Sequence, residues 1–220
     1  MSICEAIRQL EDELPKHVKL IAVSKLKGVD KIREAFACGQ RAFGENYVQE
    51  LIEKQPKLPS EIEWHFIGHL QSNKVKYIAP FVSCIHSVDS IRLLQEINKQ
   101  GMKHQRKISC LLQLHLGEED SKHGFPLHEI NTVVEKILSM SLEGINISGV
   151  MGMGSLSDDS NITASEFTAL ATVYRQLKVK YFYQSNSFNE ISMGMSGDYR
   201  IAIDKGSTMV RIGSTIFGNR

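Results

Sequence analysis

The sequence predicts an α/β fold, a single (β/α)8 barrel of the TIM type with one extra helix at its N-terminus. Eight short apolar runs alternate with longer amphipathic stretches over the 220 residues. Neighbouring parallel strands need crossover connections, so this alternation favours a parallel sheet, either closed into a barrel or left open and doubly wound. With five prolines and no Pro/Gly/Ser-rich linker, residues 1–220 are expected to form one domain, near the short end of barrel lengths.

The eight runs that we interpret as strands are dominated by apolar residues. They span 18–24, 41–44, 63–67, 81–85, 108–114, 145–151, 190–195 and 208–212. The stretches between them show the spacing of amphipathic helices. These predicted helices span 29–38, 46–55, 72–79, 89–100, 127–140, 162–180 and 198–205.

The N-terminal segment predicts the extra helix, because Ile3, Ile7, Leu10 and Leu14 recur at helical spacing. Little sequence follows the last predicted strand, which leaves no room for a full final helix. We therefore expect the N-terminal helix to pack near the resulting gap in the outer helical layer.

Charge and cysteine content exclude several classes of function. A formal net charge of +1 gives no overall attraction to nucleic acid or to an anionic membrane. No stretch approaches the roughly 20 apolar residues of a membrane span, and the N-terminus resembles neither a signal nor a transit peptide. The cysteines at 4, 38, 84 and 110 lie far apart, which predicts reduced thiols in a cytoplasmic protein. Without heptads or a long exposed strand edge, we expect a monomer.

Lys25 closes the apolar run 18–25. Side chains alternate along a strand, so Lys25 points to the same side as Ile21 and Val23. If those residues line the core, the amine lies at its mouth, where partial desolvation lowers the pKa and favours the neutral, nucleophilic form. The other interpretation is a lysine that extends into solvent at the strand end.

Two turns containing Gly and Ser follow the last two predicted strands. Ser196 lies in the first turn, and Gly213 and Ser214 lie in the second. Phosphate groups often bind at these two positions of a barrel, where backbone N–H groups and hydroxyls contact the oxygens. Gly and Ser also form ordinary turns, but two such turns at adjacent positions favour phosphate binding.

Arg211 lies inside the last predicted strand, where it cannot be left without a partner. It either forms an internal salt bridge, for which Glu45 and Asp198 are candidates, or donates to an acceptor atom of a bound ligand. A strand-end lysine, phosphate-binding turns and an inward arginine are the groups with which proteins hold pyridoxal 5'-phosphate (PLP).

His65 and His69 do not predict a metal site, because a strand end and a glycine separate them and no third ligand is evident. The methionines in 149–154 and 191–196 are expected to fill the core and the pocket. The charged stretch 117–125 predicts a solvated loop.

Several segments, in order along nearly the whole chain, resemble the pyridoxal phosphate homeostasis proteins. They are IAVSK (21–25), GQRAFGENYVQE (39–50), EWHFIGHLQSNK (63–74), SVDS (87–90), SKHG (121–124), SMGMSGD (192–198) and GSTMVRIGSTIFG (206–218). That family consists of single-domain barrels similar to the N-terminal domain of alanine racemase. The resemblance implies that Lys25 forms the Schiff base with PLP and that Arg211 faces the pyridine nitrogen. It also implies that Asn46 and His65 lie beside the ring.

The same resemblance implies that Ser196 binds the phosphate together with the backbone of Gly213 and Ser214. Two positions depart from the family pattern. Ser214 stands where many members carry threonine, which keeps the hydroxyl, and the stretch GVMGMGS (149–155) lacks the usual proline.

We therefore expect a protein that holds PLP and serves vitamin B6 homeostasis, with apo forms of PLP-dependent enzymes as candidate recipients. An arginine at the ring nitrogen disfavours protonation of the pyridine, which makes the cofactor a weaker electron sink. Alanine racemase adds acid–base groups, including a tyrosine from a second, β-rich domain that this sequence does not contain. Efficient catalysis is not expected. The alternatives are a PLP-dependent amino-acid racemase and a lysine-dependent aldolase acting on a sugar phosphate.

Overall fold

The structure is a computed structural model, and it describes residues 1–117, 123–155, 157 and 159–218. Most of the loop predicted at 117–125 therefore lies outside the described residues. All of the predicted strands and helices lie inside them.

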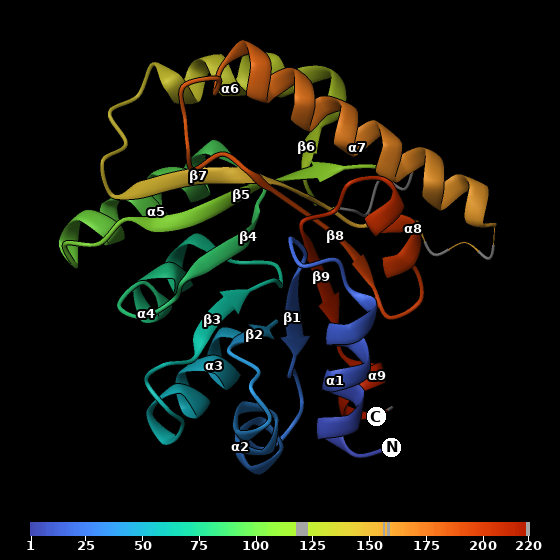
Figure 1. The fold of residues 1–220 in the computed structure, drawn as a ribbon. Helices are drawn as coiled ribbons and strands as arrows, with labels where there is room; N and C mark the ends of the chain where they lie inside the picture. The colour runs from blue at the N-terminus through green and yellow to red at the C-terminus, as the bar shows by residue number, and fades with distance from the viewer. Residues whose placement is uncertain (118–122, 156, 158, 219–220) are drawn as a thin grey trace.

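The described strands form a parallel sheet that closes on itself (Figure 1). The order is β4-β3-β2-β1-β9-β8-β7-β5, and pairing between β4 and β5 completes the barrel, while the short β6 pairs with β5 outside this ring. The strands are β1 (Lys19–Val23), β2 (Ala42–Glu45), β3 (Glu63–Phe66), β4 (Cys84–Val88), β5 (Ile108–His115), β6 (Phe125–Pro126), β7 (Ile145–Gly152), β8 (Glu190–Met195) and β9 (Met209–Ile212). The predicted closed barrel is confirmed, and the open doubly wound alternative is excluded.

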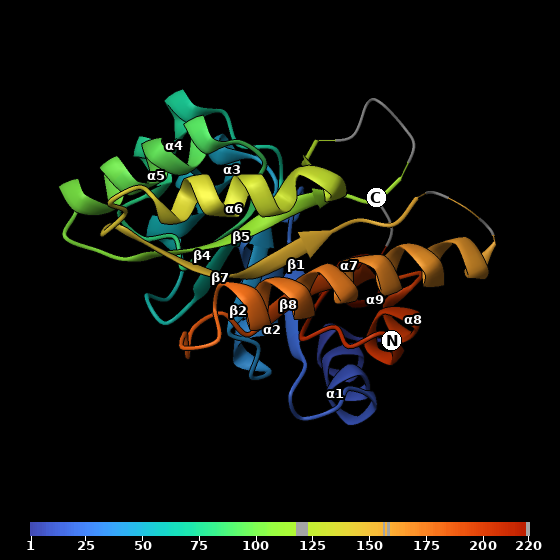
Figure 2. The same cartoon turned by 90° about the horizontal axis from the view of Figure 1, so that it is seen from above.

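Helices cover the outside of this barrel, and Figure 2 shows α6 and α7 lying across β5 and β7. The α-helices are α1 (Ile3–Glu13), α2 (Val29–Ala37), α3 (Val48–Lys54), α4 (Val75–Ile78), α5 (Ile91–Lys103), α6 (Ile130–Leu138), α7 (Ser160–Lys180), α8 (Tyr199–Asp204) and α9 (Ser214–Phe217). Short 3-10 helices precede or follow some of them: η1 (Gln55–Lys57), η2 (Ser72–Lys74) and η3 (Leu127–Glu129).

Local sequence accounts for several helix starts. Ser2 and Glu5 form a reciprocal capping box at the start of α1, and the Ser90 side chain accepts from the backbone N–H of Leu93 at the start of α5. Each cap satisfies backbone donors that the first helical turn leaves unpaired. α5 begins at Ile91, close to the predicted start at 89, and the other predicted helices also begin within three residues of their predicted starts.

One strand begins later than the sequence suggests. The run 81–85 predicts a strand, but β4 spans Cys84–Val88. Val82 is fully buried, yet its backbone N–H bonds to the carbonyl of Ile78 and so continues the turn that ends α4. Buried residues are usually apolar whether they lie in a turn or in a strand. The apolar run therefore could not show where the connection ends and the strand begins.

The N-terminal helix lies at the junction of the first and last strands, as expected. α1 packs against α2 and against the short α9 (Figure 1). The carboxylate of Glu13 accepts hydrogen bonds from Tyr199 and Arg200 in α8, at 2.7 and 2.9 Å. α9 itself and the two-residue β6 have no counterpart in the sequence prediction, because four and two residues are too few for a periodic pattern to repeat.

The prediction of four separate thiols is wrong for one pair. Cys4 in α1 and Cys38 at the end of α2 form a disulfide, with Cα atoms 5.4 Å apart. Spacing along the chain could not show this pairing, which arises because α1 and α2 pack side by side. Cys84 and Cys110 are free and buried, as expected.

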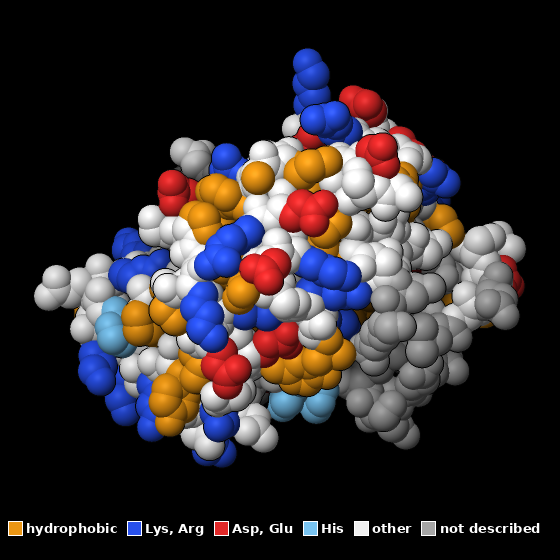
Figure 3. Space-filling model, turned by 90° about the horizontal axis from the view of Figure 1, so that it is seen from below, with side chains coloured by type: hydrophobic (Ala, Val, Ile, Leu, Met, Phe, Trp, Pro, Cys, Tyr) orange, Lys and Arg blue, Asp and Glu red, His pale blue; other side chains and the backbone are white. Residues whose placement is uncertain are grey.

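No helix in the described part of the chain combines the length and apolar character of a membrane span. On the described part of the face shown in Figure 3, basic and acidic side chains alternate over short distances. This surface agrees with the formal net charge of +1.

Candidate functional site

A cavity of about 420 Å³ lies at the carboxyl ends of the strands. Parallel strands of a barrel bring their carboxyl ends to one mouth, which is where barrel enzymes and binding proteins place their sites. The described residues that line it are Val23, Lys25, Lys27, Asn46, Ile67, Met153, Met195, Ser196, Gly197, Arg211, Gly213, Ser214 and Gly218. Six of the seven residues predicted for the site are in this set.

Two lysines line the cavity directly after β1. Lys25 is half-buried in the turn that ends the strand, and it lines the cavity. Lys27 donates to the carbonyl oxygens of Phe217 and Gly218, at 3.3 and 3.0 Å. These bonds tie the loop after β1 to the end of α9 and close one side of the cavity.

Arg211 in β9 is buried and reaches the cavity from inside the barrel. Its Nη1 donates to the Ser192 hydroxyl at 2.6 Å, and its Nη2 donates to the carbonyl of Gly152 at 3.1 Å. Burial lowers the pKa of Arg211 to about 10, which still leaves the guanidinium charged at neutral pH. Glu45 is not its partner, since that carboxylate pairs with Lys54 at 2.7 Å.

The two predicted turns meet at the same cavity. Ser196 follows β8, Gly213 connects β9 to α9, and Ser214 is the first residue of α9. A tight turn holds the first of them, because the backbone N–H of Asp198 bonds to the carbonyl of Met195 at 3.1 Å. Two hydroxyls and the adjacent backbone thus border a cavity whose described ionisable lining residues are all basic. This combination suits a phosphate group.

Asn46 lines the cavity just after β2, and its Oδ1 is buried with no hydrogen-bond partner among the described residues. Buried polar atoms in folded proteins usually have a partner. This oxygen at the wall of the cavity is therefore an acceptor to which a bound ligand can donate a hydrogen bond.

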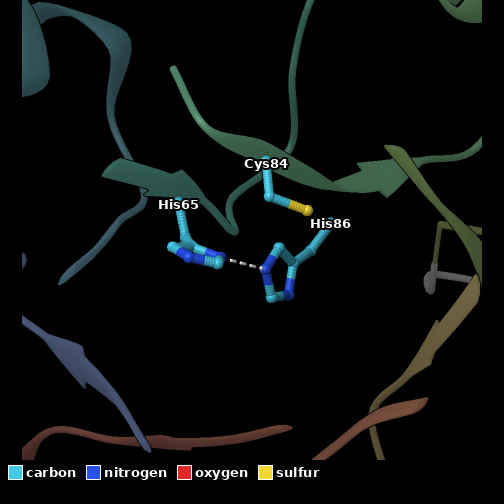
Figure 4. Close-up of side chains that lie close together, drawn as sticks. All are labelled: His65, Cys84 and His86. Atoms are coloured by element: carbon cyan, nitrogen blue, oxygen red, sulfur yellow. Dashed lines mark hydrogen bonds between the residues drawn. The ribbon is translucent and has the colours of Figure 1, made fainter. Parts of the chain in front are cut away.

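The structure does not bring His65 to this cavity, which corrects its predicted place beside the ligand ring. His65 lies within β3, paired with Gly44 and Cys84, and its side chain points into the barrel interior. Ile67, two residues later on the same face, is the residue of this segment that reaches the cavity. His65 sits one layer deeper, beside His86 and Cys84 (Figure 4).

A chain of buried hydrogen bonds links His65 to Arg211. His65 Nδ1 contacts His86 Nε2 at 2.8 Å, His86 Nδ1 contacts the Ser192 hydroxyl at 2.9 Å, and Ser192 accepts from Arg211. A guanidinium only donates, so Ser192 accepts from Arg211, and its hydroxyl can in turn donate to His86 Nδ1. With the His86 proton on Nε2, that ring would donate to His65 Nδ1. In this tautomer all the donors point from the cavity toward the opposite end of the barrel.

Burial sets the protonation of this chain. The pKa of His86 lies well below its usual value because of burial, with smaller contributions from His65 and Arg211. Burial also lowers the pKa of His65 and raises the pKa of the neighbouring Cys84 thiol to about 12. Two neutral imidazoles and a neutral thiol therefore lie beneath the charged guanidinium.

Sequence reasoning missed the residues that hold Arg211 in place. Ser192 and His86 are polar residues inside apolar strands, on the side that faces the barrel interior. The sequence does hold one sign of this arrangement. His86 lies between Cys84 and Val88 at the alternating positions of β4 that face the same side, which indicates a polar side chain inside the barrel. Lys27 was also missed, although it follows Lys25 by two residues.

Comparisons with known proteins identify the family of this chain. The family model described as alanine racemase, N-terminal domain, matches residues 2–220. The pyridoxal phosphate homeostasis protein of Mus musculus is 43% identical over 212 residues, covering 92% of this chain and 77% of that protein. The protein of the same name from Vibrio alginolyticus is 38% identical over 211 residues, covering 94% and 88%. The chain therefore belongs to the pyridoxal phosphate homeostasis protein family.

Solved structures agree with this assignment. PipY, the COG0325 family member of Synechococcus elongatus PCC7942, solved with PLP bound, has a TM-score of 0.91 and 34% identity, with 99% of this chain and 100% of that chain covered. Alanine racemase from Clostridium difficile 630 has a TM-score of 0.77 at 16% identity, and the similarity covers 57% of that chain. The second comparison supports the fold alone.

Proposed function

We propose that this protein binds PLP in the cavity at the carboxyl ends of the strands, holds it reversibly through Lys25, and serves to store and deliver it. The observation that carries the proposal is the convergence of Lys25, Ser196 and Arg211 on one cavity. PipY, solved with PLP bound, supports it as a relative of 34% identity.

The residues present fit the chemistry of this cofactor. PLP supplies an aldehyde and a dianionic phosphate. A lysine amine can bind the aldehyde as a Schiff base. Ser196, Ser214 and the backbone at Gly213 would hold the phosphate. The buried Oδ1 of Asn46, which has no partner among the described residues, would accept from a donor on the bound molecule.

Arg211 would face the pyridine nitrogen and keep it unprotonated, because a permanent cation disfavours a second positive charge beside it. The hydrogen bonds from Arg211 to Ser192 and Gly152 fix the guanidinium in this place. Among the described lining residues the ionisable side chains are Lys25, Lys27 and Arg211. This set suits attachment and release of the cofactor more than proton transfers on a substrate, so we propose no efficient catalysis.

Visible absorption of the purified protein tests this function. Added PLP is expected to give a visible band that borohydride removes, with the reduced adduct mapped by mass spectrometry to Lys25. Bound PLP is expected to pass to an apo PLP-dependent enzyme and restore its activity. A protein that stays colourless with PLP would favour the aldolase alternative. Steady-state racemisation of alanine that is lost in Lys25→Ala would establish a racemase instead.

We also propose that the protein acts in the cytoplasm as a monomer, with apo enzymes as recipients of its PLP. Disulfides are rare in that compartment, so alkylation of intact cells before lysis would report whether the Cys4–Cys38 disulfide is present there. Light scattering after size exclusion would report the oligomeric state, and a dimer would contradict the proposal.

A further inference from the structure

A second group of polar side chains gathers at the carboxyl end of the barrel, outside the set that lines the PLP cavity. It consists of His69 after β3, Asp89 directly after β4, and His123 before β6. His69 Nδ1 lies 3.3 Å from Asp89 Oδ2, and His123 Nδ1 lies 3.8 Å from the same oxygen. The two imidazole rings stack with centroids 4.0 Å apart and an interplanar angle of 15°.

These distances are close to those within a metal coordination sphere. One ligand atom from each of the three residues lies within 4.8 Å of the other two. A tetrahedral zinc ion with bonds of about 2.0–2.1 Å separates its ligand atoms by about 3.3–3.5 Å. Small side-chain rotations would therefore place all three atoms around one ion. Two imidazoles and one carboxylate are a ligand set that first-row divalent metals accept.

The backbone beneath the two histidines is fixed by close packing. A Cβ on Gly68 would lie 2.2 Å from the carbonyl oxygen of Asn46, so only glycine permits this approach. Gly124 has a φ of +138°, and a Cβ there would lie 2.8 Å from the backbone nitrogen of His115. The Gln113 side chain donates to the carbonyl of His123 at 2.8 Å. Each histidine is thus adjacent to backbone that cannot easily shift, which preorganises the cluster.

The cluster is also accessible to an ion. A polar groove of about 470 Å³ borders His69 and Asp89. The Asp89 side chain is only 13% exposed, whereas those of His69 and His123 are 46% and 58% exposed. A sheltered carboxylate beneath two accessible imidazoles leaves the remaining coordination positions to water.

A different cluster, formed by His65, Cys84 and His86, also places ligand atoms close together. Both nitrogens of His86 and the Nδ1 of His65 are already used in the hydrogen-bond chain to Ser192. A metal there would break that chain, whereas the side chains of His69, Asp89 and His123 belong to no such network among the described residues.

We propose that His69, Asp89 and His123 form a binding site for a divalent transition-metal ion of the zinc type. The site is independent of the PLP cavity in its ligands. It joins the connections that follow three neighbouring strands, β3, β4 and β5.

Calorimetric titration of the full chain with zinc chloride, after removal of metals by a chelator, tests the proposal. We expect about one ion per chain, bound in the micromolar range or tighter. His69→Ala and His123→Ala should each weaken binding by at least about tenfold, because even the loss of an outer partner of a ligand costs about that much. Both side chains are about half exposed, so the variants should fold, which circular dichroism would verify.

His128→Ala is the matched control. His128 is an exposed histidine whose Nε2 lies 3.5 Å from a Glu129 carboxylate oxygen, a single imidazole and carboxylate pair, and its removal should leave the affinity unchanged. Cobalt absorption would separate the sources of binding, because a thiolate charge-transfer band would indicate the cysteines. The absence of binding, equal affinity in all variants, or a thiolate band would each overturn the proposal.

Discussion

The two mouths of the barrel carry opposite arrangements of charge. The cavity at the carboxyl ends has a volume of about 420 Å³, and its described ionisable lining residues are all basic. The cavity at the amino ends, of about 330 Å³, is lined by Lys19, Glu63, His65, Glu190 and other polar residues. There Lys19 and Glu63 pair at 2.8 Å. One mouth suits an anionic ligand, and the other balances its charges within the protein.

The hydrogen-bond chain from Arg211 through Ser192, His86 and His65 connects these two mouths. It ends beside Glu63, whose pKa is held at about 2 by His65 and Lys19. In the proposed function, the residues that contact the ligand all lie at the carboxyl mouth. The side chains deeper in the barrel orient Arg211 through hydrogen bonds and add to the stability of the fold.

The largest expected difference between the two mouths is the loss of cofactor attachment in Lys25→Ala. Removing the amine removes the only proposed point of covalent attachment, so the visible band and the borohydride-trapped adduct should both disappear. Lys27→Ala, at the same mouth, is the matched control and should keep both. Retention of the adduct in Lys25→Ala would show that the cofactor is attached at another residue, which would contradict the assignment of the carboxyl mouth as the binding site.

Ser192→Ala tests the layer between the mouths. Arg211 and His86 would each lose a buried hydrogen-bond partner, and we expect unfolding by urea to show a loss of about 1–3 kcal/mol. Ser109→Ala, at the amino mouth, should cost less than about 0.5 kcal/mol. PLP affinity should fall in the first variant only. Equal behaviour of the two would show that the chain of hydrogen bonds does not position Arg211.

The buried histidines predict a specific dependence of stability on pH. The pKa values of His65 and His86 are lowered in the folded protein by burial, whereas unfolded histidine titrates near 6.5. The unfolded state therefore binds more protons below pH ~6.5, and stability falls there by up to ~1.4 kcal/mol per pH unit for each histidine. Thermal melts between pH 8 and pH 5 would show the decline. In His86→Leu the slope should be smaller, and an unchanged slope would assign the effect to other groups.

The smallest effect is expected at the amino mouth, from Glu63→Gln. Its lowered pKa means that it contributes stability above pH ~4.5, which is lost as the pH falls toward about 2. Because the side chains of Lys19 and Glu63 are 45% and 47% exposed, solvent screening limits the contribution to less than about 1 kcal/mol. Denaturant titration at pH 7 should detect little change, and PLP affinity should stay the same. A large loss of affinity would show that the two mouths are coupled through this carboxylate.

Strand-end chemistry made much of the candidate site predictable. Lys25, Ser196 and Ser214 each follow an apolar run, and the carboxyl ends of parallel strands necessarily share one mouth. The depth of a side chain within the barrel was not predictable, because it depends on how far neighbouring strands are staggered. His65 shows this limit, since it faces inward as expected but lies below the cavity.

Contacts between segments that are far apart in the sequence could not be predicted either. Cys4 meets Cys38 only through the packing of two helices, and the cluster at His69 draws on three different connections. The sequence shows no third ligand next to the histidines at 65 and 69, because the partners come from later in the chain. The periodicity of the sequence shows which face of a helix or strand is buried, but it does not show which other element packs against that face.

Pairing of the first strand with the last has a consequence for biosynthesis. Ile21 in β1 pairs with Arg211 in β9, so the two sides of the cavity come from segments that are far apart in the sequence. A nascent chain that has not yet reached Met209 displays Lys25 without Arg211 or the turn at Ser214, and the barrel around it is still open. If PLP binds as proposed, a nascent chain would capture it only after β9 and the turn at Ser214 have been synthesised, so shorter nascent chains would not trap PLP.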